Sequence, residues 1–71
     1  YQALESHLQA EDLMNLIAAL PTGYRMVFNL YAIEGYSHLE IAAQLGITEN
    51  TSKSQLSRAR ALLQKRLIEL N

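Results

Sequence analysis

The sequence of 71 residues contains no cysteine, which excludes a disulfide bond and a metal site built from thiolates. No apolar run approaches the roughly 20 residues that a membrane-spanning helix requires, and no basic segment followed by an apolar stretch marks a signal peptide. The single proline and the three glycines leave every position after Gly46 without a helix breaker. The chain begins at Tyr1 rather than methionine, and we expect it to be a fragment of a longer protein.

The sequence also lacks the residue patterns of a catalytic or cofactor site. Its serines have no histidine and acid at motif spacing, and there is no glycine-rich loop to hold a phosphate. Glu34 and Glu40 are more simply a helix end and a capping residue than an acid–base pair. We therefore expect a protein that is not an enzyme, with no catalytic residue, no cofactor and no bound metal.

The formal net charge is only −1, which taken alone argues against a nucleic-acid partner. The charges are, however, segregated along the chain. Residues 1–24 contain three acidic residues and no lysine or arginine, whereas residues 48–71 contain five basic residues against two acidic ones, a local charge of +3. A basic segment of this kind can bind an anionic partner although the chain as a whole is nearly neutral.

Apolar residues make up 49% of the sequence, which is enough for the core of one small helical domain. The stretch 11–20 has apolar residues at helical spacing and is followed by Pro21, which predicts a helix that ends before the proline. The run 24–35 fits helical spacing better than strict alternation, and Gly35 is a typical residue at a helix end. Residues 1–9 fit a linker or a helical extension equally well.

The next part of the chain carries the start and stop signals of two successive helices. Ser37 and Glu40 form the S-x-x-E pattern, in which each side chain satisfies a backbone N–H at a helix start. Gly46 can adopt the positive φ that ends this helix, and Thr48 is placed to begin the next one. Two helices joined by such a turn are typical of a helix-turn-helix, whose second helix enters the DNA major groove. We predict an all-α domain of four helices over residues 10–71, without a wing.

The last helix is expected to bury one side and expose the other. Its buried side repeats every three to four residues, at Ser52, Leu56, Ala59, Leu63, Leu67 and Leu70. The Ser52 hydroxyl is expected to bond to a carbonyl in the preceding turn. The opposite side presents polar groups that suit base edges and phosphates, on Asn50, Lys53, Ser54, Ser57 and Arg58. The same pattern also describes an ordinary solvated helix face. His38 lies in the first turn of the preceding helix, where a backbone phosphate could pass, but we interpret it as a surface residue.

Three motifs then occur in a specific order: LP-x3-R-x-VF-x-L at Leu20–Leu30, EGYSHLEIAAQLGI at Glu34–Ile47 and T-x-K-S-x-L-x-R-A-R at Thr51–Arg60. Together they closely resemble region 4, the C-terminal domain of bacterial RNA polymerase sigma factors, with the extracytoplasmic-function group as the nearest match. The sequence departs from that pattern at three positions: Ser52 where valine is usual, Asn50 where glycine is common, and Ser57 where some relatives have a larger side chain.

The resemblance implies a cytoplasmic, monomeric domain that recognises the minus-thirty-five promoter element as duplex DNA. The matching positions for DNA contact are Thr51, Lys53, Ser54, Ser57, Arg58 and Arg60. Within this set, Thr51 would be a phosphate contact and Arg60 a backbone or structural partner. The implied protein partners are the β-subunit flap of RNA polymerase and an anti-sigma factor.

Two other functions remain open from the sequence. One is the output domain of a response regulator or quorum-sensing activator, which has a similar four-helix build and usually dimerises through its last helix. The other is a module that binds protein alone, either polymerase or an anti-sigma factor, as the small size and the neutral overall charge would allow.

Overall fold

The computed structural model of the chain describes residues 10–70, and all the regular secondary structure in that part is helical. The elements are α2 (Ala10–Ala18), α3 (Thr22–Phe28), the π-helical turn η1 (Asn29–Ile33), α4 (His38–Leu45) and α5 (Glu49–Leu70). The prediction of a small all-α domain with four helices is confirmed, and residues 10–70 contain no strand that could form a wing. The linker or helical extension predicted for residues 1–9 lies outside the described residues.

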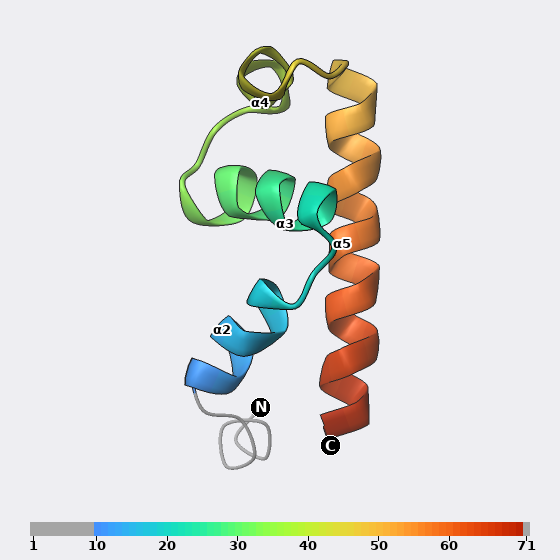
Figure 1. The fold of residues 1–71 in the computed structure, drawn as a ribbon. Coiled ribbons are helices and arrows are strands. Elements are labelled where there is room, and N and C mark those ends of the chain that lie inside the picture. Colours follow the sequence, from blue (N-terminus) through green and yellow to red (C-terminus); the bar gives the residue numbers. More distant parts are fainter. Residues whose placement is uncertain (1–9, 71) are drawn as a thin grey trace.

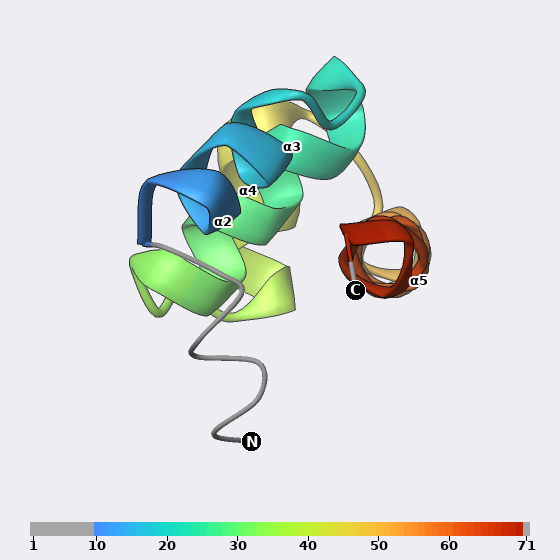
Figure 2. The same ribbon diagram turned by 90° about the horizontal axis from the view of Figure 1, so that it is seen from below.

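The 22-residue α5 runs the length of the molecule, and the other helices are packed along one side of it. In Figure 1, α4 lies beside the N-terminal turns of α5, α3 beside its middle, and α2 toward its C-terminal end. Figure 2, which looks along α5, shows all three shorter helices on the same side of this helix. One flank of α5 is thus committed to packing, and the opposite flank is left to solvent.

Two apolar clusters attach the short helices to α5. One joins the end of α2 to the C-terminal half of α5 through Ile17, Leu20, Ala59 and Leu63. The other joins α3, α4 and α5 through Val27, Ile41 and Leu56, of which Ile41 is fully buried. Phe28 packs against both clusters, so they form one continuous core. The predicted buried side of the last helix is confirmed as far as Leu63, whereas Leu67 is half-buried and Leu70 is exposed.

The first connection differs from the prediction in its boundaries. Helix α2 ends at Ala18 rather than Leu20, and Leu20 is buried beyond the helix end. Pro21 has φ −51° and ψ 145° and caps α3, so Thr22 and Gly23 already belong to this helix, which begins before the predicted run 24–35. The proline ring fits a helix start because that position needs no N–H donor.

The α3 helix widens at its end into the π-helical turn η1. The Glu34 N–H donates to the Asn29 carbonyl at 3.0 Å, a bond that spans five residues instead of four. Gly35 then takes φ 81°, which confirms the predicted stop. Spacing arguments treat every turn as having 3.6 residues, and they therefore do not predict this wider turn.

The predicted signals of the helix-turn-helix are all confirmed. The Ser37 hydroxyl accepts from the Glu40 N–H at 3.1 Å, and the Glu40 carboxylate accepts from the Ser37 N–H at 2.9 Å. Gly46 ends α4 with φ 67°. The Thr48 hydroxyl accepts from the Thr51 N–H at 3.0 Å, and α5 begins at Glu49. Helices α4 and α5 are therefore the two helices of the motif, and both have capped N-termini.

We predict that Gly46→Ala lowers the free energy of unfolding by about 1–2 kcal/mol, because an L-residue is strained at this positive φ. Gly23→Ala is the matched control: Gly23 is helical, and a Cβ there would meet Gln55 at an ordinary 3.6 Å. This control should leave stability unchanged or raise it by up to about 1 kcal/mol. Urea unfolding of the three proteins measures both effects, and equal losses for the two variants would contradict the assignment.

A second prediction concerns the pH dependence of the capping box. Hydrogen bonds from the Ser37 backbone and side chain lower the pKa of Glu40 below its ordinary value of 4.5. The stabilisation is therefore fully present above pH 4.5 and is lost as the pH falls through the lower pKa of the folded state. Glu40→Gln should be less stable than the parent near neutral pH and equal to it in acid. Urea unfolding between about pH 3 and 7 tests this, and a pH-independent difference would contradict it.

Candidate nucleic-acid interface

The candidate interface is the solvent-facing side of the first turns of α5. Its exposed residues are Asn50, Lys53, Ser54, Ser57 and Arg58, which we call the recognition face. None of these side chains belongs to the two apolar clusters. The face therefore keeps its polar groups available to a partner while the other side of α5 is held by the core.

Hydrogen bonds at the start of α5 limit the contacts that the hydroxyls of Thr51 and Ser54 can make with DNA. Thr51 is half-buried, and its hydroxyl accepts from the Thr48 hydroxyl at 2.8 Å, which makes it part of the helix start. The Ser54 hydroxyl donates to the Thr51 carbonyl at 3.0 Å. With its hydrogen used in this way, Ser54 is left as an acceptor, which suits the amino groups of bases better than phosphate oxygens.

Lys53 is paired in this structure. Its Nζ lies 3.5 Å from the Glu49 carboxylate one turn earlier, with 57% and 47% of the two side chains exposed. Exposed pairs at this spacing contribute only about 0.3–0.5 kcal/mol, so an anionic partner can replace Glu49 at low cost. The pair was not foreseen from the sequence, although the spacing of four residues between Glu49 and Lys53 indicates it.

His38 and Ser52 form a contact that contradicts the predictions for both residues. The fully buried Ser52 hydroxyl lies 2.8 Å from His38 Nδ1, across the two helices of the motif, and His38 is half-buried. The His38 ring also stacks on Tyr31, with centroids 4.4 Å apart and planes at 17°. His38 is therefore not a plain surface residue, and Ser52 bonds to another helix instead of its own preceding turn. A buried hydroxyl needs a hydrogen-bond partner, and this requirement is the signal in the sequence that could have indicated a partner for Ser52.

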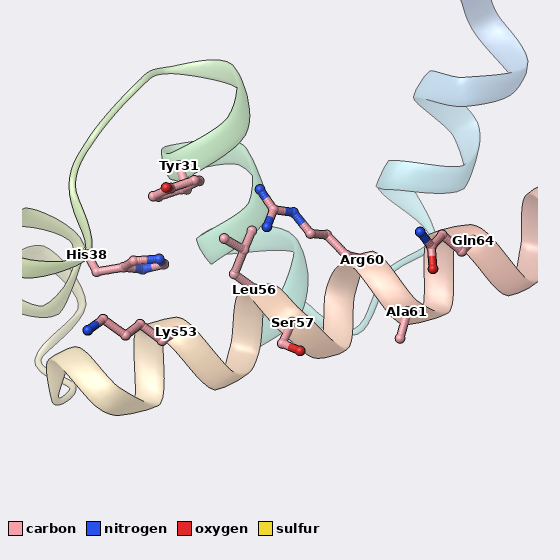
Figure 3. A pocket seen from close by; sticks show the side chains of 8 residues that line it. All are labelled: Tyr31, His38, Lys53, Leu56, Ser57, Arg60, Ala61 and Gln64. Atoms are coloured by element: carbon pink, nitrogen blue, oxygen red, sulfur yellow. The ribbon is translucent and has the colours of Figure 1, made fainter.

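Arg60 is exposed but is directed differently from the recognition face. Its guanidinium carbon lies 5.8 Å from the centroid of the Tyr31 ring, within range of a cation–π interaction. Figure 3 shows the Arg60 side chain extending from α5 toward Tyr31. The predicted set of contact residues is thus divided between the recognition face, the helix start at Thr51 and this flank at Arg60.

A capped first helix, a glycine turn and a second helix with an exposed polar face now stand together in one domain. A model of the family described as "Sigma-70, region 4" matches residues 10–63. The chain belongs to this family. It is a DNA-binding, non-enzymatic family of sigma-factor domains, which agrees with the expectation that the chain is not an enzyme.

A curated relative of this region 4 domain is the probable RNA polymerase sigma factor RfaY of Xanthomonas campestris pv. campestris. The two are 32% identical over 68 residues, which cover 92% of the chain and 17% of the relative. The chain thus spans about a sixth of the length of that protein. No solved structure matches the chain.

The described residues of this region 4 domain offer neither a metal centre nor a membrane segment. Within residues 10–70, no group of three or more His, Cys, Asp or Glu side chains is placed to hold a metal ion. No helix in that range is long and apolar enough to cross a bilayer.

We predict that Ser52→Ala lowers the free energy of unfolding by about 0.5–1.5 kcal/mol, because the hydrogen bond to His38 across the motif is lost. Ser57→Ala is the matched control, since Ser57 is exposed on the same helix and should change stability by less than about 0.5 kcal/mol. Thermal or urea unfolding measures both. A stability loss no larger at Ser52 than at Ser57 would show that the contact contributes nothing.

Proposed function

We propose that this chain recognises the minus-thirty-five element of promoters as duplex DNA, as region 4 of an extracytoplasmic-function sigma factor. The observation that carries the proposal is the recognition face. In this region 4 domain, the first turns of α5 present polar side chains that do not take part in the core. In a helix-turn-helix, these turns enter the major groove.

The chemistry of the recognition face fits base edges at its centre and phosphates at its margins. Arg58 is exposed and can donate two parallel hydrogen bonds to guanine O6 and N7. Ser54 is left as an acceptor by its bond to the Thr51 carbonyl. Lys53 can exchange Glu49 for a phosphate or a guanine, and Ser57 can contact either group. Thr51 is proposed as a phosphate contact through its remaining hydroxyl hydrogen.

Electrostatics supports an anionic partner at this end of the chain. The charge of +3 over residues 48–71 is balanced elsewhere by the acidic residues at the start of the chain. Binding should therefore weaken steeply as salt rises, because cations released from DNA drive association.

The polymerase partner is proposed to bind a separate apolar groove. A pocket of about 320 Å³ lies between α3–η1 and α4, lined by Met26, Asn29, Leu30, Glu34, Gln44 and Leu45. Met26 is 42% exposed there, and it offers apolar surface to a partner together with Leu30 and Leu45. We propose that this groove receives the β-subunit flap of RNA polymerase, and that an anti-sigma factor would act by covering it. The domain is proposed to work as a monomer in the cytoplasm.

The two other functions considered from the sequence make different predictions. The family match favours a sigma factor over the output domain of a response regulator or quorum-sensing activator. Such an output domain would give a symmetric footprint over two half-sites. A module that binds protein alone would show no binding to duplex DNA that depends on salt and on the recognition face.

We predict that Arg58→Ala weakens binding to duplexes selected from a random library by the parent chain. Discrimination at one or two base pairs should fall by about 1–3 kcal/mol, the contribution of a good bidentate contact. Lys65→Ala is the matched control, because it removes one exposed positive charge from the same helix about four turns away from the start of the recognition face. It should change affinity little at any base pair.

Fluorescence anisotropy at several salt concentrations measures both variants. Equal affinity of Arg58→Ala and the parent would contradict the assignment of Arg58. Absence of salt-dependent binding by the parent would instead support the protein-binding alternative.

A further inference from the structure

A polar pocket opens on the flank of α5 next to the recognition face. It has a volume of about 410 Å³ and is lined by Tyr31, His38, Lys53, Leu56, Ser57, Arg60, Ala61 and Gln64. Its lining includes two cationic side chains and no carboxylate. Lys53 and Ser57 belong to both the pocket and the recognition face, so the two surfaces are continuous.

Ser52 determines which nitrogen of His38 faces this pocket as a donor. The Ser52 hydroxyl has no exposed surface, and the hydrogen bond that the structure gives it is the one at 2.8 Å to His38 Nδ1. We assign the Ser52 hydroxyl as the donor and His38 Nδ1 as the acceptor of this bond, and the assignment places the ring hydrogen on Nε2.

Stacking fixes the direction in which this Nε2–H points. The Tyr31 ring covers one face of the His38 ring at 4.4 Å. In Figure 3 the His38 ring lies between the Tyr31 ring and the side chain of Lys53. Arg60 reaches the same pocket from the next turns of α5, with its guanidinium over the ring of Tyr31. The pocket thus combines an oriented ring N–H donor with two cations on flexible side chains.

We propose that this pocket holds a phosphate of the DNA backbone, with His38 Nε2–H as an oriented donor, Arg60 and Lys53 as its cations, and Ser52 as the residue that positions His38. The inference rests on the proposed function, because it requires α5 to lie in the major groove. The first helix of such a motif crosses the backbone that borders the groove, and His38 is the first residue of α4. A phosphate there would contact α4 and α5 together and would fix the register of the recognition face.

The test measures the affinity of the chain for a library-selected duplex in which methylphosphonate replaces one phosphate at a time. For the parent, neutralising the phosphate in the pocket should weaken binding about 5- to 30-fold, as loss of a charge-assisted hydrogen bond would. His38→Phe keeps a ring against Tyr31 but has no donor, and it should bind the unmodified duplex more weakly by a similar factor. In this variant, neutralising the same phosphate should have no further effect, while all other phosphates should behave as in the parent.

His38→Asn is a second variant, because its amide can still pair with Ser52 but is too short to replace the Nε2 donor. It should repeat the result of His38→Phe, and melting curves of both variants confirm that they are folded. A role of His38 in stability alone would give equal losses at every phosphate and would overturn the proposal.

Other outcomes separate the inference from the proposed function. If the parent binds duplex and Arg58→Ala weakens it, but His38→Phe loses no phosphate-specific affinity, the pocket assignment is wrong and the function stands. If the parent shows no salt-dependent binding to any duplex, both fail. If inorganic phosphate saturates the NMR signals of the His38 ring while the methylphosphonate profiles of parent and variant are the same, the pocket holds a free anion and the proposal is overturned.

Discussion

The arrangement of this domain depends on the contact among Val27, Ile41 and Leu56. These side chains come from α3, α4 and α5, and their cluster is the apolar contact that holds α4 to the rest of the chain. Helix α4 has only eight residues, and a helix of this length is not stable alone in water. Its capping box and its glycine stop define where it begins and ends, but they do not hold it against α5. Burial of Ile41 does this, and it thereby sets the geometry of the helix-turn-helix.

A polar contact complements this apolar one at the start of α4. An apolar cluster tolerates small rotations of one helix on another, since its contacts have little directional preference. The hydrogen bond between the Ser52 hydroxyl and His38 Nδ1 is directional, and the stack of His38 on Tyr31 adds a third element to it. Because Tyr31 lies in η1, the wide turn at the end of α3 helps to fix the angle between α4 and α5. Valine at position 52 would fill the core equally well but would give no such bond.

The features that could be predicted from the sequence are those whose partners lie within about one helical turn. Ser37 with Glu40, the stop at Gly46 and the start at Thr48 are local signals, and each predicted a boundary of the motif that the structure confirms. The buried side of α5 follows from helical periodicity in the same way. The contact of His38 with Ser52 joins residues 14 apart, and that of Arg60 with Tyr31 joins residues farther apart still. Such contacts depend on the crossing angle of two helices, which periodicity does not contain.

The candidate site shows the same limit. Exposure of Lys53, Ser54, Ser57 and Arg58 followed from their position opposite the buried stripe. The hydrogen bonds that each of these groups can still form did not follow from sequence position, because they depend on bonds already made inside the domain. Ser54 is bonded to the Thr51 carbonyl and Lys53 to Glu49, so fewer donors are immediately available than the composition of the face indicates. Few ready donors mean a modest affinity for isolated DNA. We therefore expect promoter binding to depend on attachment to polymerase, with the groove between α3–η1 and α4 supplying that attachment while α5 supplies the choice of sequence.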